Sequence, residues 1–127
     1  MRQSTVSMRK TVRASGPRVP FERIARTVLG KRYELSLVVC GDSLARRMNR
    51  TYRKKGYAAN VLSFPLGKND GEIFLNVQAA AREAKKYGFS LRERLTLLFS
   101  HGCLHLKGMR HGSAMEERER TLVKKFS

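Results

Sequence analysis

The segment at residues 90–108 sets strong limits on the fold, because it predicts a long helix that is apolar around most of its circumference. Ser90 and Glu93 have the spacing of a capping box at the start of a helix. Gly108 follows the segment as a residue that typically ends one. Its apolar positions surround much of the helix: Leu91, Leu95, Leu97, Leu98, Phe99, Cys103, Leu104 and Leu106. A helix of this kind is buried, so we expect it at the centre of the fold.

The rest of the chain predicts an α/β (α+β) fold, a small mixed β-sheet of about four strands with helices packed around it. Apolar alternation or apolar runs predict strands at 6–12, 35–40, 61–64 (ended by Pro65) and 73–77. Helical spacing or composition predicts helices at 21–29, 44–52, 77–87 and 113–125. Asn69-Asp70-Gly71 is a strong turn signal between the last two strands. A chain of 127 residues has room for one core, so we expect residues 1–127 to form a single domain.

The charge balance points to a polyanionic partner. The chain has 27 Lys and Arg against 10 Asp and Glu, a formal net charge of +17. Nucleic acid fits such a field best, because counterions released from phosphates give strong binding that needs no sequence-specific contact. Simple solubility or binding to anionic lipid stays open. No apolar run approaches the roughly 20 residues that span a bilayer, so we expect no membrane segment.

The cysteines and the N-terminus bear on location. Cys40 and Cys103 lie among apolar residues and form no metal-ligand pair, so we expect buried free thiols. Without a secretory signal or a disulfide framework, the cytoplasm is the expected compartment. Residues 1–20 are basic and lack acids, which leaves an organelle-targeting segment as an alternative. The apolar alternation from Val6 to Val12 favours a strand instead.

All three histidines fall within eleven residues, at His101, His105 and His111. Residues four apart share a face of a helix, so the first two imidazoles can meet at one ion. Gly108 lets the chain turn and return His111 as a third nitrogen ligand. Three protein nitrogens leave one position of a tetrahedral ion open, as in catalytic zinc sites. We expect one Zn²⁺ per chain, with other divalent metals as alternatives, and three unrelated histidines as the competing interpretation.

Position 102 argues against peptidase chemistry. Metalloproteases of the His-Glu-x-x-His type have a glutamate general base directly after the first histidine, and this chain has Gly102. A glycine on this helix instead permits close approach by a neighbouring strand or by substrate.

The histidine segment resembles a known signature. HGCLHLKGMRH at 101–111 is similar to the His-Gly-x-Leu-His-Leu-x-Gly-x-Asp-His motif of the YbeY family. Upstream, Asn49, Tyr52 and Arg53 resemble its N-x-x-Y-R element, and residues 60–65 (NVLSFP) and 71–73 (GEI) resemble two further elements in the same order. The resemblance implies a metal-dependent, single-strand-specific endoribonuclease that acts in ribosomal RNA maturation and quality control, with ribosomal RNA and the small ribosomal subunit as partners.

The resemblance also implies roles for individual residues. His101, His105 and His111 would bind zinc, and Arg53 would join His101 as a catalytic candidate. A guanidinium can hold a phosphate through two hydrogen bonds and stabilise the charge that develops in phosphoryl transfer. Further candidates for contact with substrate are Arg50, Lys54, Lys55 and Ser63.

Several positions depart from the family pattern. Arg110 replaces an Asp before the third histidine, Ala58-Ala59 replaces Pro-Thr, and Glu72 replaces Asp. We expect loss of a supporting carboxylate at position 110 to weaken metal binding or shift His111, since such losses typically cost about 10- to 100-fold. Two alternatives to the nuclease therefore stay open: a non-catalytic, metal-stabilised ribosome-assembly or RNA-binding factor, and a hydrolase of a smaller phosphoester.

Overall fold

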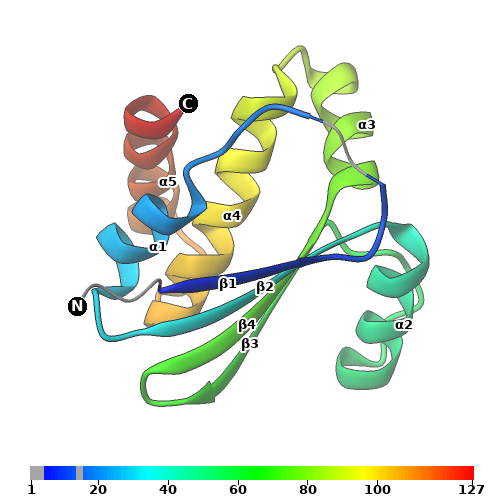
Figure 1. Ribbon diagram of the computed structural model, residues 1–127. Helices are drawn as coiled ribbons and strands as arrows, with labels where there is room; N and C mark the ends of the chain where they lie inside the picture. Colours follow the sequence, from blue (N-terminus) through cyan, green and yellow to red (C-terminus); the bar gives the residue numbers. More distant parts are fainter. Residues whose placement is uncertain (1–4, 14–15) are drawn as a thin grey trace.

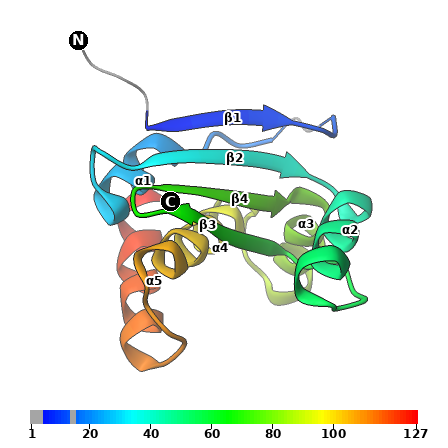
Figure 2. The same ribbon diagram turned by 90° about the horizontal axis from the view of Figure 1, so that it is seen from below.

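A mixed four-stranded sheet forms the base of the molecule. The computed structural model describes residues 5–13 and 16–127. The strand order is β1 (Val6–Lys10), β2 (Glu34–Cys40), β4 (Asp70–Asn76) and β3 (Val61–Gly67). The first three strands of this order run parallel, and β3 pairs antiparallel with β4 (Figure 2). The predicted mixed sheet is confirmed.

Helices cover the sheet unequally. In chain order they are α1 (Phe21–Leu29), α2 (Asp42–Arg53), α3 (Val77–Tyr87), α4 (Leu91–Lys107) and α5 (Ser113–Phe126). Figure 1 shows α1, α3, α4 and α5 gathered on one side of the sheet, with α2 at the other side. Helices packed around a mixed sheet confirm the predicted α+β fold.

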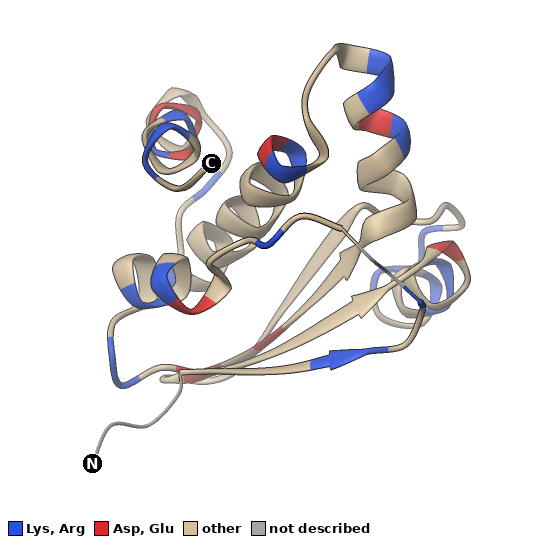
Figure 3. Cartoon of the chain, turned by 45° about the horizontal axis from the view of Figure 1, so that its top comes forward, with Lys and Arg blue, Asp and Glu red and all other residues tan. Residues whose placement is uncertain are grey.

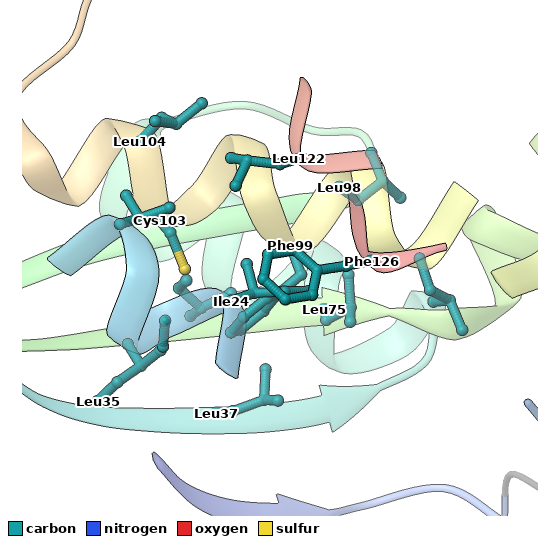
Figure 4. Close-up of a cluster of buried hydrophobic side chains, with 14 of the residues drawn as sticks. Ile24, Leu35, Leu37, Leu75, Leu98, Phe99, Cys103, Leu104, Leu122 and Phe126 are labelled. Atoms are coloured by element: carbon teal, nitrogen blue, oxygen red, sulfur yellow. The ribbon is translucent and has the colours of Figure 1, made fainter. Parts of the chain in front are cut away.

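The main core lies between this sheet face and α4. Leu37 from β2, Phe99 from α4 and Leu122 from α5 are all fully buried in it, and Figure 4 shows these side chains pointing toward one another. Ile24 of α1 closes the same cluster. Fully burying one such side chain contributes roughly 1.5–3 kcal/mol, so these contacts fix α4 between the sheet and two helices. The predicted central position of this helix is confirmed.

The ends of α4 follow local sequence signals. The backbone N–H of Glu93 donates to the Ser90 hydroxyl over 3.0 Å, and the Ser90 N–H donates to the Glu93 carboxylate over 2.8 Å. This is the predicted capping box. Gly108 ends the helix with a φ of 102°, a left-handed value that a glycine adopts without strain.

Helix α2 begins two residues earlier than predicted, at Asp42 instead of Leu44. The Asp42 backbone N–H donates to the Gln78 side-chain oxygen over 2.8 Å. The group that satisfies this helix start thus comes from α3, 36 residues away. Local sequence patterns carry no trace of it.

The β3–β4 hairpin also differs from the prediction. The strand does not end at Pro65 but continues to Gly67, with Pro65 paired to Gly71. Because β3 is an edge strand, the missing proline N–H costs no inner hydrogen bond. The turn lies at residues 68–69, and Asp70 already belongs to β4.

The N-terminal strand is confirmed but is shorter and more exposed than predicted. β1 ends at Lys10, so Val12 lies beyond it. Met8 is 50% exposed, because β1 is the other edge of the sheet. Arg2, part of the basic segment that suggested targeting, lies outside the described residues.

Two further predictions concern the cysteines and membranes. Cys40 and Cys103 are both buried free thiols, as predicted. Burial raises the pKa of Cys40 to about 11 and raises the pKa of Cys103 as well. Both thiols therefore stay protonated at neutral pH and are poor metal ligands. Among residues 5–13 and 16–127, none of the helices has the length and apolar character needed to cross a bilayer.

Candidate metal centre

The three histidines come together at the C-terminal end of α4. His101 and His105 lie one helical turn apart, with ring centroids separated by 4.6 Å. Beyond Gly108 the chain turns back, which places the His111 ring 5.1 Å from that of His101 and 4.7 Å from that of His105. One ligand atom from each side chain lies within 4.8 Å of the others. The sequence spacing and the turn at Gly108 thus produce the predicted cluster.

This donor set fits a divalent transition metal. The group consists of three imidazoles, which are typical ligands of zinc, copper, nickel and iron. The pKa of His105 is lowered, first by burial and then by the neighbouring His101 and His111. A lowered pKa favours the neutral imidazole, which is the form that binds a metal. The three histidines could therefore hold one ion.

A carboxylate lies directly behind one of the histidines. Oε2 of Glu119, on α5, is 2.5 Å from Nδ1 of His101. The Glu119 side chain is 13% exposed and that of His101 is 25% exposed. We did not predict this contact from the sequence. A partial signal exists, because Glu119 lies four residues after the buried Met115 and three before the buried Leu122, on the face of α5 that turns toward the core.

Gly102 brings α4 into direct contact with β3. The Ser63 hydroxyl donates to the Gly102 carbonyl oxygen over 3.0 Å. A Cβ at position 102 would lie 2.9 Å from the Ser63 Oγ and 3.0 Å from Cδ1 of Ile73. Of the two partners that the glycine was expected to admit, a neighbouring strand therefore occupies the space. Ser63 still borders the cleft described next, so its predicted contact with substrate stays a prediction.

A cleft of ≈ 680 Å³ opens beside the histidines. Its lining includes all three of them, together with Arg53 from the end of α2, Tyr57 from the following loop and the edge of β3 from Val61 to Ser63. Helix α2 thus ends with Arg53 beside the same space as the imidazoles, as the resemblance implies.

The other predicted basic contacts lie outside this lining. Arg50, Lys54 and Lys55 are exposed at the C-terminal end of α2 and in the next residues. Lys54 ends the helix in a left-handed conformation, with a φ of 60°. Figure 3 shows how Lys and Arg follow α2. These three cations are close to Arg53 in the sequence, but unlike Arg53 they do not line the cleft.

An acidic residue in the cleft wall is already paired. Glu83 of α3 accepts a hydrogen bond from Nε of Arg94 over 2.9 Å and one from Nδ2 of Asn60 over 3.1 Å. Arg94 also forms an ion pair with Glu83 at 2.8 Å. The negative charge of Glu83 is therefore compensated within the protein.

Comparison with known proteins tests the resemblance. The family model described as Endoribonuclease YbeY matches residues 5–127. The chain belongs to the YbeY family. The Endoribonuclease YbeY of Geobacter sulfurreducens is 35% identical over 83% of this chain and 79% of its own length. The Endoribonuclease YbeY of Helicobacter pylori is 38% identical over 84% of this chain and 79% of its own length.

A solved structure supports the fold. The solution structure of TM1509 from Thermotoga maritima matches with a TM-score of 0.62 and 22% identity, over 82% of this chain and 74% of that one. At this identity the match concerns the fold alone. The membership in the YbeY family, inferred from the motifs at 49–53, 60–65 and 101–111, is confirmed by the family model.

Proposed function

We propose that this chain is a metal-dependent endoribonuclease that cuts single-stranded RNA, with one zinc ion bound by His101, His105 and His111. The proposal extends to ribosomal RNA of the small subunit as substrate, to maturation and quality control of ribosomes, and to the cytoplasm as location. One observation carries it: three imidazoles with converging ligand atoms and one arginine, Arg53, line the same cleft.

The metal site would serve catalysis through its open side. A bound zinc ion supplies Lewis acidity toward a phosphoryl oxygen and activates water. The protein would contribute three imidazole ligands from both sides of the Gly108 turn, and substrate would reach the ion through the cleft that they line. Peptide hydrolysis of the His-Glu-x-x-His type has no counterpart here, because position 102 is a glycine packed on β3.

Arg53 would bind the scissile phosphate. Its guanidinium offers donors in a planar fork that matches two phosphate oxygens. Donors held in place before the reaction stabilise the negative charge that grows on the phosphoryl group. Because Arg53 reaches the cleft from α2 and the histidines from α4, the two elements would hold the RNA backbone between them.

The basic residues around Arg53 would bind the RNA on either side of the cut. Arg50, Lys54 and Lys55 are exposed at the C-terminal end of α2, next in sequence to Arg53, which lines the cleft. Contacts of this kind add affinity without sequence preference, and their contribution falls as salt rises. The pairing of Glu83 with Arg94 removes an acid that would repel phosphate.

The alternatives receive less support. A non-catalytic ribosome-assembly or RNA-binding factor is not favoured, since the matching family and these relatives have the name of an endoribonuclease. The net charge of +17 favours a polymeric anion over a small phosphoester.

Cleavage of a labelled single-stranded RNA by purified protein tests the proposal. We expect wild-type protein to cut it and Arg53→Ala to lose activity by about 100-fold or more, the range of a lost transition-state donor. Arg32→Ala is the matched control, because Arg32 is an exposed arginine on the turn before β2, away from the cleft. Equal activity of wild-type protein and Arg53→Ala would contradict the role of Arg53.

Analysis of the product ends separates two nucleophiles. A 2′,3′-cyclic phosphate indicates attack by the ribose 2′-hydroxyl, and a 5′-phosphate on the downstream fragment indicates attack by water. Either outcome is compatible with a phosphodiester bond held by Arg53. Release of single nucleotides from one end, with no internal fragments, would contradict cleavage at an internal bond.

A further inference from the structure

The contact between α4 and α5 at the histidine cluster involves one carboxylate and one imidazole. Oε2 of Glu119 lies 2.5 Å from Nδ1 of His101, and both side chains are largely shielded from water. We propose that Glu119 is the positioning residue of the metal site: it accepts the Nδ1–H of His101 and so fixes which nitrogen of that ring is free to bind the ion. The inference rests on the metal site proposed above.

The fold holds Glu119 in this place. Met115 and Leu122, four residues before it and three residues after it, are 1% and 0% exposed in the main core. Both anchors lie on the same face of α5 as Glu119. Helix α5 therefore cannot rotate without exposing two core side chains, and the carboxylate stays directed at His101.

The chemistry of the two groups sets the tautomer. A carboxylate only accepts hydrogen bonds, so a neutral His101 must carry its proton on Nδ1 when it contacts Glu119. The Nε2 lone pair is then the one available to a metal. Carboxylates behind metal-binding histidines orient the ring and make it a stronger ligand in this way.

His101 is singled out among the three ligands. Within the described part of the chain, neither His105 nor His111 forms a hydrogen bond or ion pair with a carboxylate. Position 110, where the family signature has Asp, is the exposed Arg110. The site thus has a supporting carboxylate from α5, at His101, while the expected effect of Arg110 on His111 stays a prediction.

Zinc affinity of matched variants tests the inference. The dissociation constant is measured by competition with a chromophoric chelator for wild type, Glu119→Ala, Glu119→Gln and the control Glu117→Ala. Glu117 is an exposed acid on the same helix. We expect about 10- to 100-fold weaker zinc binding in Glu119→Ala, a smaller loss in Glu119→Gln, and no change in Glu117→Ala. Wild-type affinity in both Glu119 variants would overturn the proposal.

A second readout reports on the tautomer itself. Two-bond ¹H–¹⁵N spectra of the zinc-free protein at alkaline pH distinguish the Nδ1–H from the Nε2–H form of each histidine. We expect His101 to be Nδ1–H in wild type. The Glu119→Gln variant, which preserves shape, should populate both forms, because an amide can accept from Nδ1–H or donate to a bare Nδ1.

The two readouts keep the proposals apart. If wild type binds no zinc, the metal site is wrong, and the spectra still decide whether Glu119 fixes His101. If wild type binds zinc but His101 is in the Nε2–H form, the metal site stands and the positioning role is wrong. A purely structural role of Glu119 would lower the melting temperature of the zinc-free protein without moving the tautomer of Glu119→Gln.

Discussion

The hydroxyl of Ser63 donates a hydrogen bond to the carbonyl oxygen of Gly102, 3.0 Å away, and this bond joins the edge strand β3 to the helix that carries the histidines. The contact is possible because position 102 has no side chain. It fixes how far His101 and His105 extend over the edge of the sheet, and hence where the cleft lies.

Replacing Gly102 with alanine should destabilise the protein. The new Cβ would lie 2.9 Å from the Ser63 Oγ and 3.0 Å from the Ile73 side chain, so these two side chains would have to rotate, at the cost of the Ser63 hydrogen bond and of core packing, or α4 would have to move from the sheet. We expect a net loss of about 1–3 kcal/mol in the free energy of unfolding, the usual cost of overpacking. This loss outweighs the better helix propensity of alanine, worth up to about 1 kcal/mol.

Urea denaturation measures this change. Gly56→Ala is the matched control, since a Cβ there meets no atom within 4 Å and the backbone has no positive φ. A Gly102→Ala variant as stable as wild type would show that α4 does not depend on this close approach.

The second prediction concerns acid stability and the start of α2. Hydrogen bonds from Arg82, and then from Asn76, lower the pKa of Asp42 to about 2. Arg82 binds it through two nitrogens, at 2.7 and 2.8 Å. A carboxyl with a lowered pKa in the folded state stabilises the protein above its unfolded pKa and loses that contribution as the pH falls through the folded value. The loss should lie between about pH 3.9, the unfolded value, and about pH 2.

Thermal unfolding across this range tests the pair. Asp42→Asn should melt below wild type at neutral pH, and the difference should shrink as the pH falls from about 3.9 toward 2. Arg82→Ala removes the main partner, so Asp42→Asn should lower the melting temperature less in that background than in wild type. A difference in melting temperature that is constant down to the lowest pH would contradict the ionic role of Asp42.

The third prediction concerns RNA affinity. If Arg50 and Lys55 neutralise phosphates, each alanine variant should bind single-stranded RNA more weakly at low salt. Each variant should also reduce the slope of log K against log salt by the contribution of one phosphate contact, roughly 0.7 for a single strand. Arg32→Ala, which removes the same charge away from the cleft, should leave the slope close to wild type. An equal reduction of the slope in all three variants would indicate that the total charge, and not this end of α2, determines RNA binding.

Sequence patterns predicted what depends on neighbours along the chain. The Ser90 capping box, the ends at Gly88 and Gly108, and the meeting of His101 with His105 all arise within one or two helical turns. Each is governed by local hydrogen bonding or helix geometry, which a single sequence displays.

Contacts between distant segments could not be predicted from such local patterns. Gln78 caps α2 from another helix, and Glu119 reaches His101 from α5. Neither residue differs in type from its polar neighbours. Helical spacing places Glu119 on the buried face of α5, but only packing reveals its contact with His101. Pro65 was misassigned for a related reason, because its tolerance in β3 depends on that strand being at the edge of the sheet.

The most direct test of the metal-dependent nuclease is cleavage of single-stranded RNA before and after removal of metal. Wild-type protein should lose activity after treatment with a chelator and removal of the chelator by dialysis. It should regain activity when zinc is added. His105→Ala should stay inactive under all three conditions while keeping the fold, as judged by circular dichroism. Full cleavage by the metal-stripped wild type, or by His105→Ala, would contradict the account.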